Sequence, residues 1–119
     1  MPRSADPEVL LPLPAATFHV LLALAGEDLH GYAVMQEVEA RTGGRIRLSA
    51  GTLYRTIHRL LEQGLVVEVR ERPAPEQDDE RRRYYRLTRL GREVARAETA
   101  RLAGLVDMAR ERGLAPEEA

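Results

Sequence analysis

A helical stripe between residues 49 and 63 constrains the fold most. Its apolar residues recur at i, i+4, i+7 and i+8, the spacing of one buried face of an α-helix: Leu53, Ile57, Leu60 and Leu61. Ser49 can cap this helix by accepting a backbone N–H, and Gly64 ends it. The stripe needs other elements to cover it, while the opposite face stays open to solvent or to a partner.

Two further helices are predicted upstream of this stripe. The first runs over residues 15–25 with Phe18, Leu21, Leu22 and Ala25 at helical spacing, and it stops at Gly26. The second follows His30 and Gly31, with Tyr32, Met35 and Val38 on one face, and ends at the double glycine of residues 43–44. Residues 45–48 alternate in polarity, which predicts a brief strand before Ser49.

A hairpin is predicted after the third helix. Residues 65–72 place Leu65, Val67 and Val69 on one face, and residues 81–88 return with Tyr85 and Leu87 pointing inward together. Prolines and acidic residues over 73–80 form the loop between these strands. Helix, helix, turn, helix and hairpin, in this order, predict a mainly α fold with a small β-hairpin, the winged helix-turn-helix.

The last predicted helix is too long for such a domain. It is capped by Thr88, runs over residues 89–113 and would span about 37 Å. Its apolar face needs a partner, and a second copy of the chain is the simplest source, so we expect a homodimer. The predicted interface comprises Phe18, Leu90, Val94, Ala97, Leu102, Leu105, Val106 and Ala109. Residues 15–88 would be the winged-helix DNA-binding domain and 89–113 the C-terminal dimerisation helix, between flexible tails over 1–14 and 114–119.

Several functional classes find no support in the sequence. The 119 residues include no cysteine, which excludes disulfides and thiolate sites, and no apolar run reaches the length of a membrane span. The proline-rich, acidic start is unlike a secretion signal, so we expect a cytoplasmic protein. His19, His30 and His58 lie at no metal-binding spacing, and His19 and His30 are expected to be structural. No catalytic constellation is recognisable, so we expect neither an enzyme nor a metal or cofactor.

The charge pattern suggests a polyanionic partner. All 18 basic residues are arginine; residues 41–60 hold five of them and no acid, and residues 81–101 hold eight against two acids. Guanidinium groups bind phosphates and guanine edges bidentately, so both blocks suit double-stranded DNA. A helical wheel places Gly51, Arg55, His58 and Arg59 opposite the apolar stripe, with Thr52 and Tyr54 on its flanks and Glu62 at the far end.

Two of these features also have a structural interpretation. Gly51 would let the backbone approach DNA closely, or it is simply tolerated in a first helical turn. The run Arg81, Arg82 and Arg83, followed by Tyr84, would reach a flanking phosphate from the base of the hairpin, or it is a solvated strand end. We favour the DNA-binding interpretation for both, because they fall on the two elements of a winged helix that contact DNA.

Three segments closely resemble the PadR family of bacterial transcriptional regulators. They are LHGYAVMQEVE at 29–39, SAGTLYRTIHRLLEQGLV at 49–66 and RRRYYRLTRLG at 81–91, and with their connections they cover residues 15 to about 110. The resemblance implies a winged helix with a C-terminal dimerisation helix, as in the short subfamily, that binds palindromic operators and usually represses. It implies DNA contacts by Ser49, Gly51, Thr52, Tyr54 and Arg55, and by Arg82, Arg83 and Tyr84 in the wing.

The sequence departs from the family at two points. Ala50 stands where the family often has proline, which affects only the start of a helix. Some short members hold flat aromatic drugs between tryptophans, and this chain has no tryptophan. An apolar small-molecule effector would instead meet Leu102, Leu105, Met108 and Phe18, residues that equally suit a plain interface core.

The function expected from the sequence is therefore a homodimeric repressor whose two third helices occupy successive major grooves about 34 Å apart. A net charge of only −1 leaves a second possibility open, a winged-helix protein–protein interaction module that docks on an acidic protein.

Overall fold

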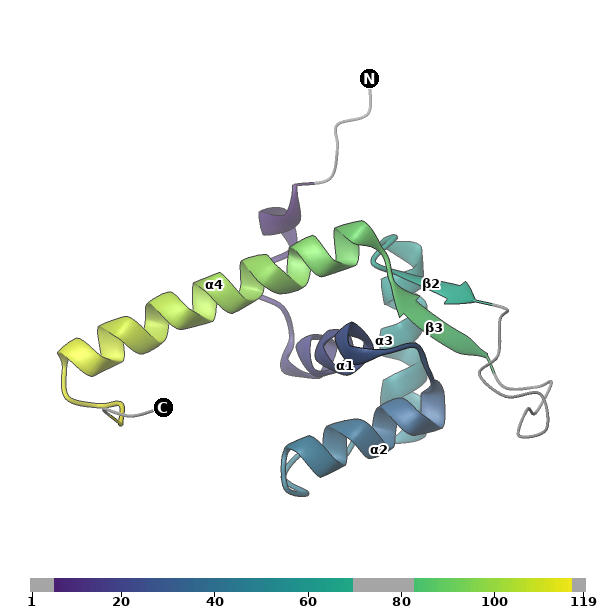
Figure 1. Cartoon of the computed structure of the whole chain (residues 1–119), viewed down its shortest axis with the longest axis horizontal. Coiled ribbons are helices and arrows are strands. Elements are labelled where there is room, and N and C mark those ends of the chain that lie inside the picture. The colour runs from purple at the N-terminus through teal and green to yellow at the C-terminus, as the bar shows by residue number, and fades with distance from the viewer. Residues whose placement is uncertain (1–5, 70–82, 117–119) are drawn as a thin grey trace.

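A computed structural model describes residues 6–69 and 83–116. The elements follow the order η1 (Pro7–Leu10), α1 (Ala15–Gly26), β1 (Leu29–His30), α2 (Gly31–Arg41), α3 (Ala50–Glu62), β2 (Val66–Val69), β3 (Tyr84–Leu87) and α4 (Arg89–Glu111). Three helices gather beside the small sheet, and α4 extends away from them on the side opposite the hairpin (Figure 1). The predicted winged helix with a long C-terminal helix is confirmed.

The sheet has three antiparallel strands in the order β1-β3-β2. Val66 pairs with Leu87 and Glu68 with Tyr85, while Leu29 pairs with Tyr85 from the other edge of β3. The strand predicted at residues 45–48 is wrong, because the extra strand is β1 instead. Residues 45–48 alternate in burial as an extended connection does, with Ile46 and Leu48 against the core, but form no ladder.

The core is aliphatic and lies between α1, α2, α3 and the start of α4. Its fully buried side chains include Leu21, Val34, Leu53, Ile57, Leu60, Leu65 and Val94. Tyr85 and Leu87 point inward as predicted, at 5% and 6% exposure. Burial raises the pKa of the Tyr85 phenol, as does the Glu68 carboxylate paired with it across the sheet, so the ring stays neutral.

The helical faces of α1 and α2 and the inward face of β2 differ in part from those predicted. α1 is apolar on nearly all sides, so the spacing did not define one face: Val20 and Leu24 are buried while Leu22 is 47% exposed. Tyr32, predicted to face inward from α2, is 59% exposed. In β2, Val66 is buried and Val67 is exposed, the reverse of the predicted inward face. Leu65 is also buried, but it precedes the strand, so the alternation of buried and exposed residues begins at Val66.

The expectation of a flexible tail over residues 1–14 is wrong for residues 7–13. Leu10, Leu11 and Leu13 pack against the core, and η1 contacts α4. The backbone N–H of Leu13 donates to Glu98 Oε2 at 3.3 Å. Glu98 is only 2% exposed and also accepts two bonds from Arg101 at 2.8 and 2.9 Å. The start of the described chain is thus held against the first half of α4.

A tight joint connects α3 to α4. Thr88 caps α4 as predicted, accepting the N–H of Gly91, and its hydroxyl also donates to the carbonyl of Gly64 at 2.7 Å. The backbone N–H of Thr88 donates to the carbonyl of Leu65 at 3.1 Å. A Cβ on Gly91 would overlap that same carbonyl oxygen, so glycine is required for the two backbones to lie this close.

Candidate nucleic-acid interface

The exposed face of α3 starts from a well-formed cap. Ser49 Oγ accepts the N–H of Thr52 at 3.1 Å, and the two hydroxyls are hydrogen-bonded at the same distance, so both are used within the first turn. Leu53, Ile57 and Leu60 bury the opposite face, as the stripe predicted. One shallow, open depression runs along the exposed face, lined by Gly51, Tyr54, Arg55, His58, Arg59 and Glu62.

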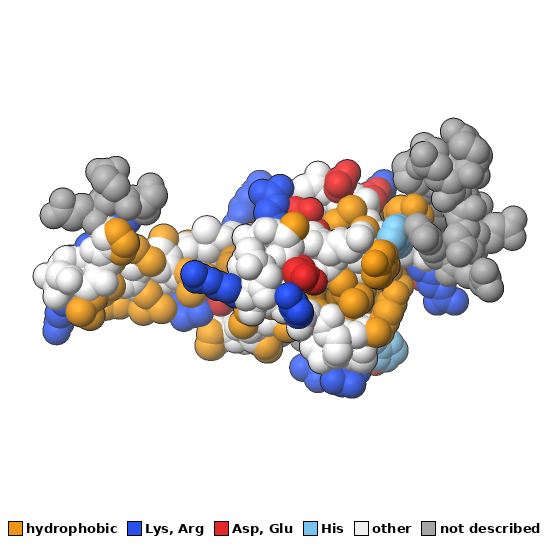
Figure 2. All heavy atoms as spheres, turned by 90° about the horizontal axis from the view of Figure 1, so that it is seen from below, with side chains coloured by type: hydrophobic (Ala, Val, Ile, Leu, Met, Phe, Trp, Pro, Cys, Tyr) orange, Lys and Arg blue, Asp and Glu red, His pale blue; other side chains and the backbone are white. Residues whose placement is uncertain are grey.

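The arginines of this face have no carboxylate partner within the described parts of the chain. Arg55 makes one long contact, from Nη2 to Thr52 Oγ1 at 3.4 Å, and Arg59 has no ion pair with any residue in 6–69 or 83–116. Glu62, the only acid on the face, lies 3.2 Å from the Nε2 of His58 instead. In Figure 2, arginine and histidine side chains gather over α3 at the lower edge of the compact part of the molecule. Both guanidinium groups are therefore available to an external anion.

Tyr54 serves the fold as well as the exposed face. Its side chain is 49% exposed, yet a Cβ on Gly31 would overlap its hydroxyl, so the ring lies directly on the start of α2. The sequence pattern predicts a DNA contact for Tyr54 and no special role for Gly31. The structure gives Gly31 a role, because a side chain there would displace the Tyr54 ring from its position on the start of α2.

The hairpin contributes less free charge than its sequence suggests. Arg83 is exposed but lies across the sheet from Glu68, with Nε and Oε2 3.8 Å apart. Tyr84 is half-buried, and its ring meets the edge of the His30 ring with centroids 5.3 Å apart. His30 also caps α2 by accepting the N–H of Ala33, which is the structural role expected of it. Arg81 and Arg82 lie outside the described residues, so their predicted DNA contacts stay predictions.

The far half of α4 presents an exposed apolar stripe. Leu102, Leu105, Val106 and Ala109 follow helical spacing, and Leu105 and Val106 are 46% and 41% exposed. Figure 2 shows hydrophobic side chains along this projecting arm. Of the other predicted interface residues, Val94 is fully buried within the chain, and Phe18 and Leu90 pack against the core. Contacts within the chain already cover these three side chains, so the stripe on the far half of α4 is the part available to a partner.

A cavity of about 400 Å³ lies elsewhere, between α1 and α2. It is lined by His19, Leu22, Ala23, Gly26, Glu37, Val38, Arg41 and Thr42. None of the four residues proposed for an effector lines it, and Leu105 and Met108 are exposed on the arm of α4. Across residues 6–69 and 83–116 there is no cluster of three metal-ligating side chains. No helix in these ranges combines the length and the hydropathy needed to cross a bilayer.

Comparison with known proteins decides the family. The model of the transcriptional regulator PadR-like family matches residues 20–97, which include α2, α3 and the hairpin. The chain belongs to the PadR-like family. Its relatives include transcriptional regulator Rv3488 of Mycobacterium tuberculosis, 41% identical over 78 residues, a match that covers 66% of this chain and 66% of the relative.

Solved structures of PadR-like and other regulators share the fold. A PadR family transcription regulator from Clostridium difficile superimposes with a TM-score of 0.67 at 20% identity, covering 82% of this chain and 97% of that one. A transcriptional regulator from Clostridium thermocellum gives a TM-score of 0.69 at 18% identity, covering 91% and 97%. Both superpositions cover a larger share of this chain than residues 20–97, the part that the family model matches.

Proposed function

We propose that this chain is a sequence-specific DNA-binding repressor that acts in the cytoplasm as a homodimer, with α3 of each protomer in the major groove. The observation that carries the proposal is the exposed face of α3, where Arg55 and Arg59 lack a carboxylate partner in the described structure. Such side chains bind phosphates and guanine edges, and a winged helix presents this helix to DNA.

The stripe on α4 supports the homodimer. Leu102, Leu105, Val106 and Ala109 recur at i, i+3, i+4 and i+7, the pattern by which one helix packs on another. Burying Leu105 and Val106 against the same residues of a second copy removes apolar surface from water and sets two α3 helices at a fixed separation. We expect that separation to match half-sites about 34 Å apart on a palindromic operator.

The proposal is tested by titrating fluorescent DNA from upstream of the chain's own gene with the full-length protein. We expect affinity to fall by a factor of about 10³ or more between 50 and 200 mM salt if the dimer contacts at least six phosphates, together with a palindromic footprint. Binding that is absent, or that does not change with salt, contradicts the proposal. Binding to an acidic protein with no DNA footprint would instead favour an interaction module.

The oligomeric state is tested separately by light scattering after gel filtration. Leu105→Asp places a charge in the stripe, and we expect it to convert the dimer to a monomer. Leu22→Asp is the matched control, since Leu22 on α1 is equally exposed but lies outside the stripe. A wild-type monomer, or equal effects of both substitutions, contradicts the dimer. An apolar effector bound at the dimer centre would raise the melting temperature of the wild type more than that of Leu105→Asp.

A further inference from the structure

We propose that the turn between α2 and α3 binds backbone phosphates of DNA through Arg45 and Arg47, and that Glu39 occupies Arg47 while the protein is free. The inference rests on the proposed function, because it extends the same interface to two residues that lie outside the exposed face of α3. Both belong to the basic block over residues 41–60, but neither is among the individual residues predicted to contact DNA.

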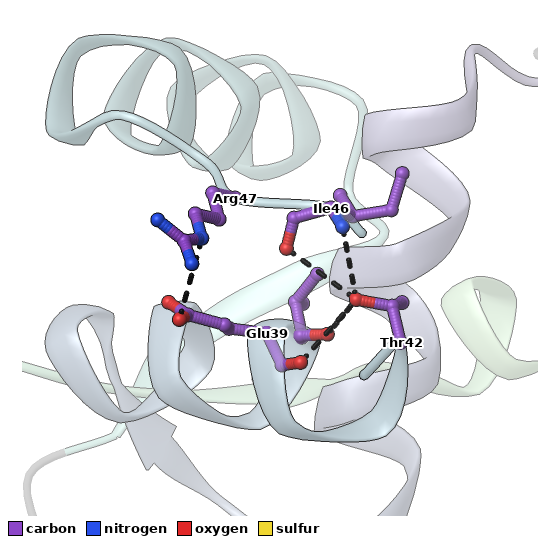
Figure 3. Close-up of polar contacts among 5 residues, drawn as sticks. Glu39, Thr42, Ile46 and Arg47 are labelled. Atoms are coloured by element: carbon purple, nitrogen blue, oxygen red, sulfur yellow. Dashed lines mark hydrogen bonds and ion pairs between the residues drawn. The ribbon is translucent and has the colours of Figure 1, made fainter. Parts of the chain in front are cut away.

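The turn is built rigidly around one hydroxyl (Figure 3). Thr42 Oγ1 donates to the carbonyl of Val38 at 2.9 Å and accepts the N–H of Ile46 at 3.0 Å. Gly43 and Gly44 both have positive φ, 63° and 82°, and the N–H of Gly44 donates to the carbonyl of Glu39 at 2.8 Å. Because these bonds fix the backbone on both sides of the reversal, the residues that follow leave it in a defined direction.

Packing then decides which side chains face outward. Ile46 and Leu48 pack against the core, so Arg45 and Arg47 between them are exposed. In an extended segment alternate residues lie on one side, about 6.6 Å apart along the chain. Arg47 precedes Ser49, the cap of α3, by two residues. The two arginines therefore lie in the segment that leads into the start of α3, the helix that carries Gly51 and Arg55.

The charges around this turn favour an external anion over an internal one. No acidic residue occurs between Glu39 and Glu62 in the sequence. Arg45 has no carboxylate partner in the parts of the chain that the structure describes. Arg47 has a single contact, from Nε to Glu39 Oε2 at 3.5 Å, and its side chain is 74% exposed while that of Glu39 is 50% exposed. A long, solvated pair of this kind is weak and exchanges easily for a phosphate.

Arg41 provides a contrast within the same basic block. Its Nε lies 2.7 Å from Glu37 Oε2 on the same helix, a short i,i+4 pair, and it borders the cavity between α1 and α2. We therefore expect Arg41 to contribute nothing to phosphate binding, which makes it the matched control for Arg45 and Arg47.

The test is the salt dependence of DNA affinity for full-length variants on one operator duplex and one random duplex. Each phosphate contact contributes about 0.9 to the slope of log affinity against log salt, so Arg45→Ala and Arg47→Ala should each lower the slope by about 1.8 per dimer. Both should weaken binding to the two duplexes by the same factor, because phosphate contacts carry no sequence information. Arg41→Ala should leave the slope unchanged.

Two further variants sharpen the outcome. Arg47→Lys should restore the slope, since a phosphate contact requires only a cation there. Glu39→Gln should raise affinity about twofold to threefold at low salt, because Arg47 loses its internal partner. Unchanged slopes for Arg45→Ala and Arg47→Ala, in a protein that binds its operator with the expected salt dependence, overturn this inference and leave the proposed function standing. A wild type without DNA binding overturns both.

Discussion

Arg55 and Arg59 on α3 differ from Arg86 on β3 and Arg101 on α4 in what surrounds them. Arg55 and Arg59 face an open depression with no carboxylate within reach in the described structure. On β3, Arg86 donates hydrogen bonds of 2.8 and 3.1 Å to the carboxylate of Asp28. On α4, Arg101 donates to the buried Glu98, and Arg89 forms an ion pair with Glu93. Two blocks that look equally basic in the sequence therefore differ at these positions: Arg55 and Arg59 are open to a partner, while Arg86 and Arg101 are held by carboxylates of the fold.

The largest effect on binding is expected for Arg55→Ala. Loss of a guanidinium that contacts a base should weaken operator binding by about tenfold to a hundredfold, measured by anisotropy at moderate salt. The melting temperature should not change, because the side chain is exposed and makes only one weak hydrogen bond. If Arg55→Ala destabilised the fold instead, the distinction between the two groups of arginines would be lost.

The largest effect on stability is expected for Glu98→Gln, which removes the charge but keeps the shape. Hydrogen bonds from Arg101 lower the pKa of Glu98 below its ordinary value of 4.5, burial opposes that shift, and the N–H of Leu13 adds to it. The unfolded chain thus binds this proton more tightly than the folded one. The stabilisation is complete above pH 4.5 and is lost as the pH falls through the lower, folded pKa.

We therefore expect Glu98→Gln to lower the melting temperature by several degrees at pH 7. The gap to the wild type should narrow as the pH falls below about 4.5, because protonation then removes the same charge from the wild type. Thermal melts followed by circular dichroism from pH 7 to pH 3 check both statements. A gap that stays constant over this range argues that the charge of Glu98 has no part in the stability.

A smaller effect is expected for Arg86→Ala. Its bidentate bond to Asp28 joins β3 to the connection between α1 and β1, but both side chains are more than one third exposed, so solvent screens the pair. We expect a loss of about 0.5–1 kcal/mol in the free energy of unfolding, measured by urea titration. Operator affinity should stay within about threefold of wild type, the reverse of Arg55→Ala. A large loss of affinity would place β3 among the DNA contacts.

The smallest effect is expected for Arg89→Ala. Arg89 is 94% exposed, its contact with Glu93 is 3.5 Å, and it lies in the first turn of α4, where a positive charge opposes the helix dipole. The free energy of unfolding should change by less than about 0.5 kcal/mol, and affinity should not change. Parallel urea titrations of Arg86→Ala and Arg89→Ala would compare directly how much each ion pair contributes to the free energy of unfolding.

Local signals in the sequence were sufficient for the elements that carry the interface. The stripe from Leu53 to Leu61 located α3, and the hydroxyls of Ser49 and Thr88 located two caps. The opposite face of α3 followed from the same periodicity. Each of these signals depends on residues within four positions of one another, which is the range over which a helix repeats.

Features that depend on distant partners could not be predicted. The two-residue strand β1 exists because Leu29 and His30 pair with β3, at residues 56 and 54 positions further along the chain. Leu10, Leu11 and Leu13 sit in a proline-rich stretch that has no periodicity, and only the position of α4 shows that they are covered. Likewise, the sequence gives the charge of Arg86 and Arg101 but not the carboxylates that hold them.

The contacts around Gly91 hold the start of α4 against the end of α3. The carbonyl of Leu65 lies against Gly91, and the hydroxyl of Thr88 is hydrogen-bonded to Gly64. These contacts oppose a rotation of the first turn of α4 relative to α3. A rotation of about 10° at this base carries the far end of its 23 residues through about 6 Å. In the proposed homodimer, a change in the angle between the two α4 helices would therefore change the distance between the two α3 helices.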